Sequence, residues 1–307
     1  MDDTRIERVA ADHTFPGMDK EFDSNGKWAG NFIFIQAADT QFGLIDNWAG
    51  NPPETRVWDE EIRLTREAIK RANAMTPQPK FFVVCGDLVD DGPGQQHQAA
   101  QQRDFKRLFS ELNNNIPLVC VCGNHDVGNE PTPQTLQEYR SRYGDDYFVF
   151  WVGSTLFIVL NSQLYYDHSN AVDEYKAHDA WLDEQLKICA SGECTHCVMF
   201  QHIPWFTSHP EEDDQYFNVP KVQRERMLKK LNDAGVRYVF SGHFHRNAGG
   251  KYKNLEMVVT SAIGCQIGDD VSGMRLVRVS EGKIDHKYYG LSEWPEVVDL
   301  SEDVNLP

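Results

Sequence analysis

Five short polar motifs each follow an apolar run, and their residue types are those that hold divalent metal ions. The motifs are Asp39-Thr40-Gln41, Gly86-Asp87-Leu88-Val89-Asp90, Gly123-Asn124-His125-Asp126, Gln201-His202 and Gly242-His243-Phe244-His245. Carboxylates, amides and imidazoles, with no thiolate among them, suit Mn, Fe, Zn or Mg. A glycine before three of the polar sets permits the tight turn that lets side chains converge. These motifs predict a metal-dependent active site.

The runs before the motifs have the length of buried strands. They cover residues 32–35, 81–85, 118–122, 155–160, 197–200, 237–240 and 257–259. Between them, apolar residues at helical spacing predict helices near residues 58–72, 105–112 and 228–231. Residues 146–160 and 256–289 are typical of antiparallel hairpins. Because continuous apolar strands imply sheets covered on both faces, we expect an α/β domain with two facing mixed sheets and helices outside.

The order of these motifs resembles the calcineurin-like metallophosphoesterases, and the similarity extends from Trp28 to Tyr289. Longer segments that include or lie outside the motifs resemble a branch of serine/threonine protein phosphatases: residues 79–87, 144–148, 181–186 and 241–250. The resemblance implies a four-layer sandwich, in which two facing mixed β-sheets are flanked by helices. We expect this domain to span residues 28–290. A loosely ordered segment, residues 1–27, would precede it, and an acidic tail, residues 291–307, would follow.

The resemblance also implies two metal ions that share one carboxylate. The first would be held by Asp39, Gln41, Asp87 and His245, and the second by Asp87, Asn124, His202 and His243. The family has a histidine where this chain has Gln41, and an amide oxygen is a weaker ligand than an imidazole. Three alternatives for Gln41 stay open: it could bind the metal directly, hold a metal-bound water, or make no contact with the metal. We expect a first site that is weakened and not lost.

Catalytic roles follow from the same resemblance. His125 occupies the position of the family's catalytic imidazole, which protonates the leaving alkoxide or orients the phosphoryl group, and Asp90 occupies the position that supports it. The nucleophile would be a hydroxide that bridges the two metals. Arg246 is expected to hold a phosphate oxygen in a bidentate contact, and Asn124 to contact substrate. Trp48 and Trp205 flank the motifs and are candidates for a substrate wall.

Composition restricts the partners. The chain has 47 acidic and 30 basic residues, which gives a net charge of −17. This negative charge disfavours binding to nucleic acid or to anionic membranes. The apolar runs are too short to span a bilayer, and the first residues do not resemble a secretory signal. Seven cysteines, several of them inside expected strands, favour reduced thiols over a disulfide framework. We expect a cytoplasmic monomer.

Three functions remain in competition. The first is a phosphatase that acts on phosphoserine or phosphothreonine in proteins, as the resemblance implies. The second is a small-molecule phosphodiesterase acting on cyclic nucleotides or nucleotide diphosphates, for which the same metal site would serve. The third is a metal-binding scaffold that has lost catalysis, an interpretation that Gln41 suggests. The pairing of His125 with Asp90 argues against the scaffold, and the protein phosphatase is favoured.

Overall fold

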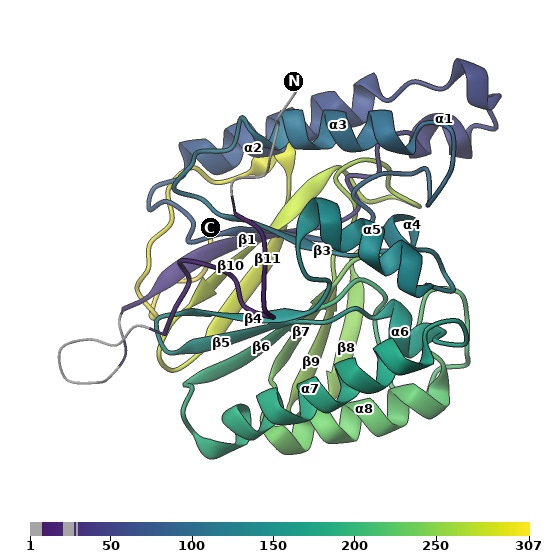
Figure 1. Cartoon of the computed structure of the whole chain (residues 1–307). Coiled ribbons are helices and arrows are strands. Elements are labelled where there is room, and N and C mark those ends of the chain that lie inside the picture. The colour runs from purple at the N-terminus through teal and green to yellow at the C-terminus, as the bar shows by residue number, and fades with distance from the viewer. Residues whose placement is uncertain (1–7, 21–27, 29) are drawn as a thin grey trace.

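The computed structural model describes residues 8–20, 28 and 30–307, and its core is a pair of stacked β-sheets with helices on both outer faces (Figure 1). The first sheet has five strands in the order β11-β10-β1-β2-β3. Its strands are β1 (Phe32–Ala37), β2 (Phe82–Cys85), β3 (Leu118–Val121), β10 (Gly273–Val279) and β11 (Ile284–Gly290). β1, β2 and β3 are parallel, and β10 runs antiparallel to β1 and to β11.

The second sheet has six strands in the order β4-β5-β6-β7-β9-β8. They are β4 (Phe148–Val152), β5 (Thr155–Val159), β6 (His196–Phe200), β7 (Tyr238–Ser241), β8 (Ala248–Tyr252) and β9 (Leu255–Val259). The four inner strands are parallel, and the two edge strands, β4 and β8, are antiparallel to their neighbours. Both sheets are therefore mixed, as predicted.

Long helices cover the outer faces. α2 (Asp59–Ala74), α3 (Gln98–Phe109) and α5 (Pro133–Tyr143) pack on the first sheet, and α7 (Val172–Ser191) and α8 (Lys221–Ala234) pack on the second (Figure 1). The short elements α1 (Leu44–Trp48), η1 (Pro53–Thr55), α4 (Asn124–Val127), α6 (Gln163–Tyr166) and η2 (Leu291–Glu293) lie in the connections. The expected four-layer sandwich is confirmed.

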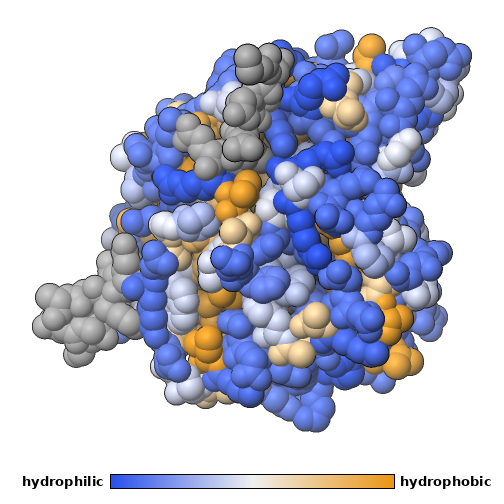
Figure 2. Space-filling model, viewed as in Figure 1, coloured by the Kyte–Doolittle hydropathy of each residue, from blue (hydrophilic) through white to orange (hydrophobic). Residues whose placement is uncertain are grey.

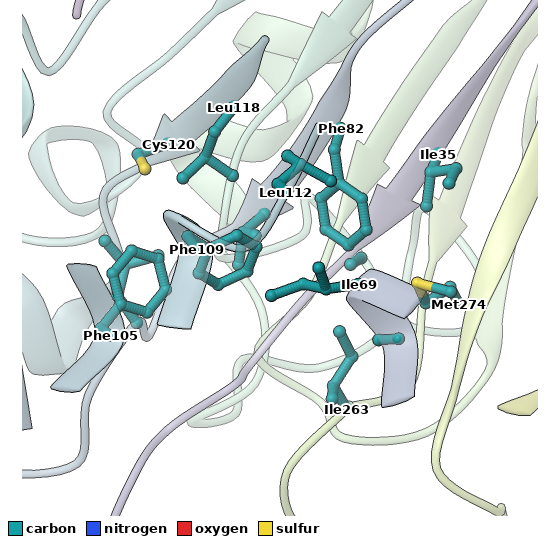
Figure 3. Close-up of a cluster of buried hydrophobic side chains, with 14 of the residues drawn as sticks. Ile35, Ile69, Phe82, Phe105, Phe109, Leu112, Leu118, Cys120, Ile263 and Met274 are labelled. Carbon is teal, nitrogen blue, oxygen red and sulfur yellow. The ribbon is translucent and has the colours of Figure 1, made fainter. Parts of the chain in front are cut away.

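Strand alternation explains why the apolar runs are continuous. In β1, Phe34 joins the cluster between the sheets, whereas Ile35 joins the cluster under the helices of the first sheet. Figure 3 shows this second cluster, where the ring of Phe82 from β2 lies 5.8 Å from that of Phe109 on α3. Since both faces of these strands are covered, most of their residues are apolar, and the five polar motifs stand at strand ends. Buried Gln36 in β1 and buried Arg275 and Arg278 in β10 are exceptions inside the strands.

The hairpins agree with the sequence in part. β4 and β5 form the expected hairpin, and so do β10 and β11. Residues 257–259 belong instead to β9, which runs parallel to β7 and antiparallel to β8. The reason is that β9 fills a position in the second sheet, whereas β10 crosses to the first.

The chain ends are packed where the structure describes them, contrary to the loose order expected. Phe15 and Met18 are buried in the cluster between the sheets, and Trp294 and Val298 are buried in the cluster under the helices of the first sheet. These apolar side chains lie in short runs without periodicity, so the sequence pattern did not indicate their burial. Residues 1–7, 21–27 and 29 lie outside the described part, and the domain boundaries stay a prediction.

The cysteines differ from expectation at one pair. Cys189 at the end of α7 and Cys197 in β6 form a disulfide, whereas the other five are free. The expectation of reduced thiols throughout is therefore wrong for this pair, because the end of α7 packs beside the start of β6.

Among the described helices, none is long and apolar enough to cross a membrane. The face shown in Figure 2 is largely hydrophilic.

Candidate metal centre

All five polar motifs meet at the carboxyl ends of the parallel strands. Asp39, Asp87, His202 and His243 each stand two residues after a strand, and Asn124 opens α4 just after β3. Within the described part of the chain, five of the eight non-glycine residues with positive φ are in these motifs: Asp39 (51°), Gln41 (34°), Asp87 (48°), His243 (69°) and His245 (53°). Left-handed backbone is costly for side chains with a Cβ, so its concentration here indicates a site shaped for function.

Two glycines make the convergence possible. Gly86 has φ of 85°, and a Cβ there would lie 2.3 Å from Nδ1 of His202. A Cβ at Gly123 would lie 2.2 Å from the Asp87 carboxylate. Any larger residue at either position would push the metal-ligand side chains apart, as the glycine pattern predicts.

The side chains form two groups that share Asp87. One contains Asp87, His202 and His243, and the other contains Asp39, Asp87 and His245; in each, the possible ligand atoms lie within 4.8 Å of one another. All five residues are buried. Oδ1 of Asn124 lies 3.0 Å from Nε2 of His202, which places the amide beside the first of these groups. The arrangement matches two metal positions with a common carboxylate.

Backbone carbonyls fix the imidazoles. Nδ1 of His202 donates to the Cys85 carbonyl over 2.7 Å, Nε2 of His243 donates to the Tyr216 carbonyl over 3.0 Å, and Nδ1 of His245 donates to the Cys265 carbonyl. In each ring, one nitrogen donates to a backbone carbonyl, and the other nitrogen takes no part in that hydrogen bond. Such outer contacts select the tautomer and orient the ligating nitrogen of histidines that bind metals.

The charges of the site favour a cation. Burial alone would lower the pKa of His202, but the carboxylates of Asp87 and Asp39 outweigh it and raise that pKa to about 9. Burial likewise opposes ionisation of Asp87, yet the neighbouring imidazoles of His202 and His125 hold its pKa well below the usual range. Burial and the proximity of His202 lower the pKa of His243 to about 3, so this ring is neutral. A metal ion would replace the His202 proton as the partner of these carboxylates.

Gln41 lies in the site with its amide already oriented. Nε2 of Gln41 donates to Oδ1 of Asp90 over 3.2 Å, whereas its Oε1 is buried without a hydrogen-bond partner among the described residues. A buried carbonyl oxygen without a partner is costly, and a cation would satisfy it. The donor set and this oxygen both fit a divalent metal.

His125 and Asp90 are neighbours, but mainly through the backbone. Nδ1 of His125 donates to the Asp90 carbonyl, and lies 3.6 Å from Oδ1 of the Asp90 side chain. That carboxylate instead accepts from Gln41 and, over 2.9 Å, from Nδ2 of Asn47. Asp90 therefore links the imidazole position to Gln41.

A cavity of about 110 Å³ opens onto the metal centre. It is lined by Gln41, Leu44, Trp48, Asp87, His125, Tyr216, Phe217, His243, His245 and Ile267. Trp48 is 68% exposed and forms part of the wall, whereas Trp205 is fully buried in the core of the second sheet, so the expectation for Trp205 is wrong. Arg246 does not line the cavity: its guanidinium packs on Phe244 and its Nε donates to the carbonyl of Ile267.

Tyr216 is a site residue that sequence analysis missed. Its carbonyl accepts from His243, its ring lies 5.0 Å from the His243 ring, and its hydroxyl accepts from Nδ2 of Asn124 over 3.2 Å. One residue thus orients two of the expected ligands of the second metal. Tyr216 follows the acidic run 211–214, and such a run is typical of a solvated surface loop.

The loop that carries Tyr216 is built around a buried acid. Glu212 accepts from the backbone N–H groups of Thr207 (2.7 Å) and Ser208 (2.8 Å) and from Nδ2 of Asn218 (2.6 Å). Burial opposes this charge, but the hydrogen bonds outweigh it and lower the pKa of Glu212 to about 2. The loop is consequently a fixed support for Tyr216.

Tyr216→Phe should weaken metal binding at the second site by about tenfold, because Asn124 loses the acceptor that orients its amide. The ring and the carbonyl that contact His243 are retained, so the fold and the first site should be unaffected. Metal titration followed by calorimetry measures the effect. Tyr252→Phe, which removes a hydroxyl at the far end of β8, is the control. Equal affinities in both variants would show that Asn124 is oriented without the hydroxyl.

Comparisons with known proteins agree with this geometry. The family model described as "Calcineurin-like phosphoesterase" matches residues 33–247. The chain is 52% identical over 272 residues to serine/threonine-protein phosphatase CPPED1 of Bos taurus, covering 88% of this chain and 87% of that protein. It is 44% identical over 289 residues to the CPPED1 of Danio rerio, covering 94% and 93%.

Solved structures show the same architecture. A crystal structure of a dimetal phosphatase from Danio rerio superposes with a TM-score of 0.62 at 16% identity, covering 85% of this chain and 97% of that chain. This likeness supports the fold, and the closer sequence relatives support the family. The chain belongs to the calcineurin-like phosphoesterase family.

Proposed function

We propose that this chain is a serine/threonine protein phosphatase that works with two divalent metal ions. The observation that carries the proposal is the pair of buried ligand groups that share Asp87, with the imidazole of His125 on the same cavity. The CPPED1 relatives, which carry the name of this activity, match the chain over most of its length.

The ligands divide between the two ions. Asp39, Gln41, Asp87 and His245 would hold the first, and Asp87, Asn124, His202 and His243 the second. Hard carboxylate and amide oxygens with borderline imidazoles suit Mn, Fe, Zn or Mg. The bound pair would supply Lewis acidity, which activates water near neutral pH and neutralises phosphate charge.

His125 is the residue that handles the proton. Burial alone would lower its pKa, but the carboxylates of Asp87 and Asp90 outweigh it and raise that pKa, which favours the imidazolium. Nδ1 is held by the Asp90 carbonyl, so Nε2 is left to donate its proton to the departing serine or threonine oxygen. Asp90 positions this ring and the Gln41 amide together.

The cavity suits a phosphorylated side chain presented on a protein surface. It is small, and exposed Trp48 and Tyr216 stand at its wall, where they can contact the flanking peptide. Asn124, beside His202, and Arg246, whose Nε donates to the carbonyl of the cavity residue Ile267, are candidates for phosphate contacts. We further propose a monomer that acts in the cytoplasm and binds neither nucleic acid nor membranes, in keeping with the net charge of −17.

A substrate panel tests the activity. Phosphoserine and phosphothreonine peptides should be hydrolysed by the protein loaded with Mn or Mg, with kcat/KM far above that for cyclic nucleotides or nucleotide diphosphates. A preference for the nucleotides would instead establish the phosphodiesterase alternative. The absence of turnover with every substrate and metal would leave a metal-binding scaffold.

Gln41→His should shift the metal dependence of activity to lower Mn or Mg concentration by about tenfold, since an imidazole is a stronger ligand than an amide. Histidine tolerates the left-handed backbone of this position, where φ is 34°. Gln41→Ala, which removes the unpartnered oxygen, should shift the titration in the opposite direction. Coincident titrations for the wild type and Gln41→Ala would show that Gln41 is not a ligand.

A further inference from the structure

A second cavity lies at the opposite end of the second sheet from the metal centre. It has a volume of about 510 Å³ and is lined by Thr195, His196, Arg237, Tyr238, Lys251, Lys253, Asn254, Glu256, Gly282, Lys283 and Ile284. We call it the basic groove. β6 and β7 begin at its wall and end at the metal centre, and the β8–β9 and β10–β11 turns complete it (Figure 1).

The groove gathers positive charge in a strongly acidic chain. Four of its lining side chains are cationic (Arg237, Lys251, Lys253 and Lys283) and one, Glu256, is a carboxylate, while Glu302 accepts from the backbone N–H of Gly282 at its edge. Across the whole chain acidic residues outnumber basic ones, 47 to 30, so a random groove would be negative. A concave wall of like charge concentrates the field and attracts anions.

The two carboxylates that form ion pairs with the groove lysines are each engaged by a second basic group. Glu256 lies 3.9 Å from Nζ of Lys251, but it is also 3.3 Å from Nε2 of His286. Asp285, which lies 3.2 Å from Nζ of Lys283, is held more closely by Arg278 at 2.7 Å. Each acid is thus shared between two basic groups.

Arg237 and Lys253 have the weakest engagement. Within the described chain, the guanidinium of Arg237 donates only to the Val236 carbonyl, over 3.4 Å, and makes no ion pair. The Lys253 ammonium lies 5.1 Å from the centre of the Tyr252 ring. Both side chains are exposed, so an anion could reach them from solvent, although Lys253 also interacts electrostatically with Asp233.

We propose that the basic groove binds a polyanionic peptide segment, bearing carboxylates or phosphates, of the protein whose phosphorylated residue enters the metal centre. The proposal rests on the phosphatase activity proposed above. Guanidinium and ammonium groups on several turns match charges that repeat along an extended peptide. β6 is five residues long, so groove and metal centre are about 15–25 Å apart with the loops included. A segment about ten residues from the phosphorylated position spans that distance.

Binding to a fluorescein-labelled short peptide tests the proposal by fluorescence anisotropy. Peptides rich in glutamate, in phosphoserine or in glutamine distinguish carboxylate, phosphate and uncharged ligands. Lys251→Glu combined with Lys253→Glu reverses two exposed charges of the groove. Lys176→Glu combined with Lys187→Glu makes the same change in net charge on α7, where both side chains are 69% exposed.

The groove variant should bind both anionic peptides about tenfold or more weakly, whereas the α7 variant should stay within about twofold of the wild type. Turnover of a small aryl phosphate should be unchanged in both variants. For a phosphopeptide with an acidic segment about ten residues from its phosphorylated residue, kcat/KM should fall in the groove variant and not in the α7 variant.

Two results would overturn the proposal. Equal losses in the groove and α7 variants would mean that general electrostatics accounts for the binding, and tighter binding of a single-stranded oligonucleotide would assign the groove to nucleic acid. Failure of the proposed function would give another result. Neither the wild type nor either variant would hydrolyse a phosphopeptide, although the groove variant would still bind the anionic peptides more weakly.

Discussion

His243→Ala should lose one of two bound metal ions and at least about 10³-fold in kcat/KM for an aryl phosphate, because a catalytic metal supplies several kcal/mol of transition-state stabilisation. His243 is buried, its Nε2 is committed to the Tyr216 carbonyl, and its low pKa keeps it neutral. Its remaining nitrogen is therefore ready to bind a cation. Metal content by mass spectrometry and steady-state turnover measure the two losses in the same sample.

The control for this variant is His209→Ala. His209 lies in the same loop region as Tyr216, but its side chain is 61% exposed and its ring lies 4.0 Å from Glu211. It should retain both metals and full activity. If His243→Ala kept two metals and normal turnover, the assignment of the second site would be wrong.

His125→Ala should keep both metals yet hydrolyse a phosphoserine peptide about 10²–10⁴-fold more slowly, the usual span for one acid–base group. A serine alkoxide is a poor leaving group and needs the proton, whereas an aryl oxide leaves readily without it. The loss on an aryl phosphate should therefore be much smaller. Comparing kcat for the two substrates separates proton donation from binding.

Equal losses on both substrates would show that His125 binds the phosphoryl group and donates no proton. Retained metal content is the internal control, because the His125 backbone N–H donates to Oδ1 of Asp87 over 2.8 Å and that contact survives the substitution. Loss of metal would instead place His125 among the residues that build the site.

The place of the carboxylate and imidazole side chains in the candidate site could be predicted from the sequence. Asp39, Asp87, His202 and His243 each follow a strand whose apolar run is continuous, and parallel strands bring their carboxyl ends to one edge. The same runs predicted two sheets covered on both faces. Residue type and strand position together were enough to locate the candidate centre.

Contacts made by the backbone could not be predicted in this way. The carbonyls of Cys85, Tyr216 and Cys265 orient the imidazoles, and any residue type supplies a carbonyl. Glu212 stands in an acidic run that is typical of solvated loops, and only the folded loop shows that backbone N–H groups surround it. Burial of Phe15 and Trp294 likewise depends on tertiary packing.

The left-handed backbone at the metal centre makes the stability of the folded protein, and so its lifetime, depend on bound ions. Each such residue costs on the order of 1 kcal/mol, and here five of them surround buried like charges. Ions that bind the folded chain and not the unfolded one offset that cost by mass action. A cell short of metal would therefore hold less of this protein as well as a less active form of it, since the apoprotein would unfold and be degraded sooner.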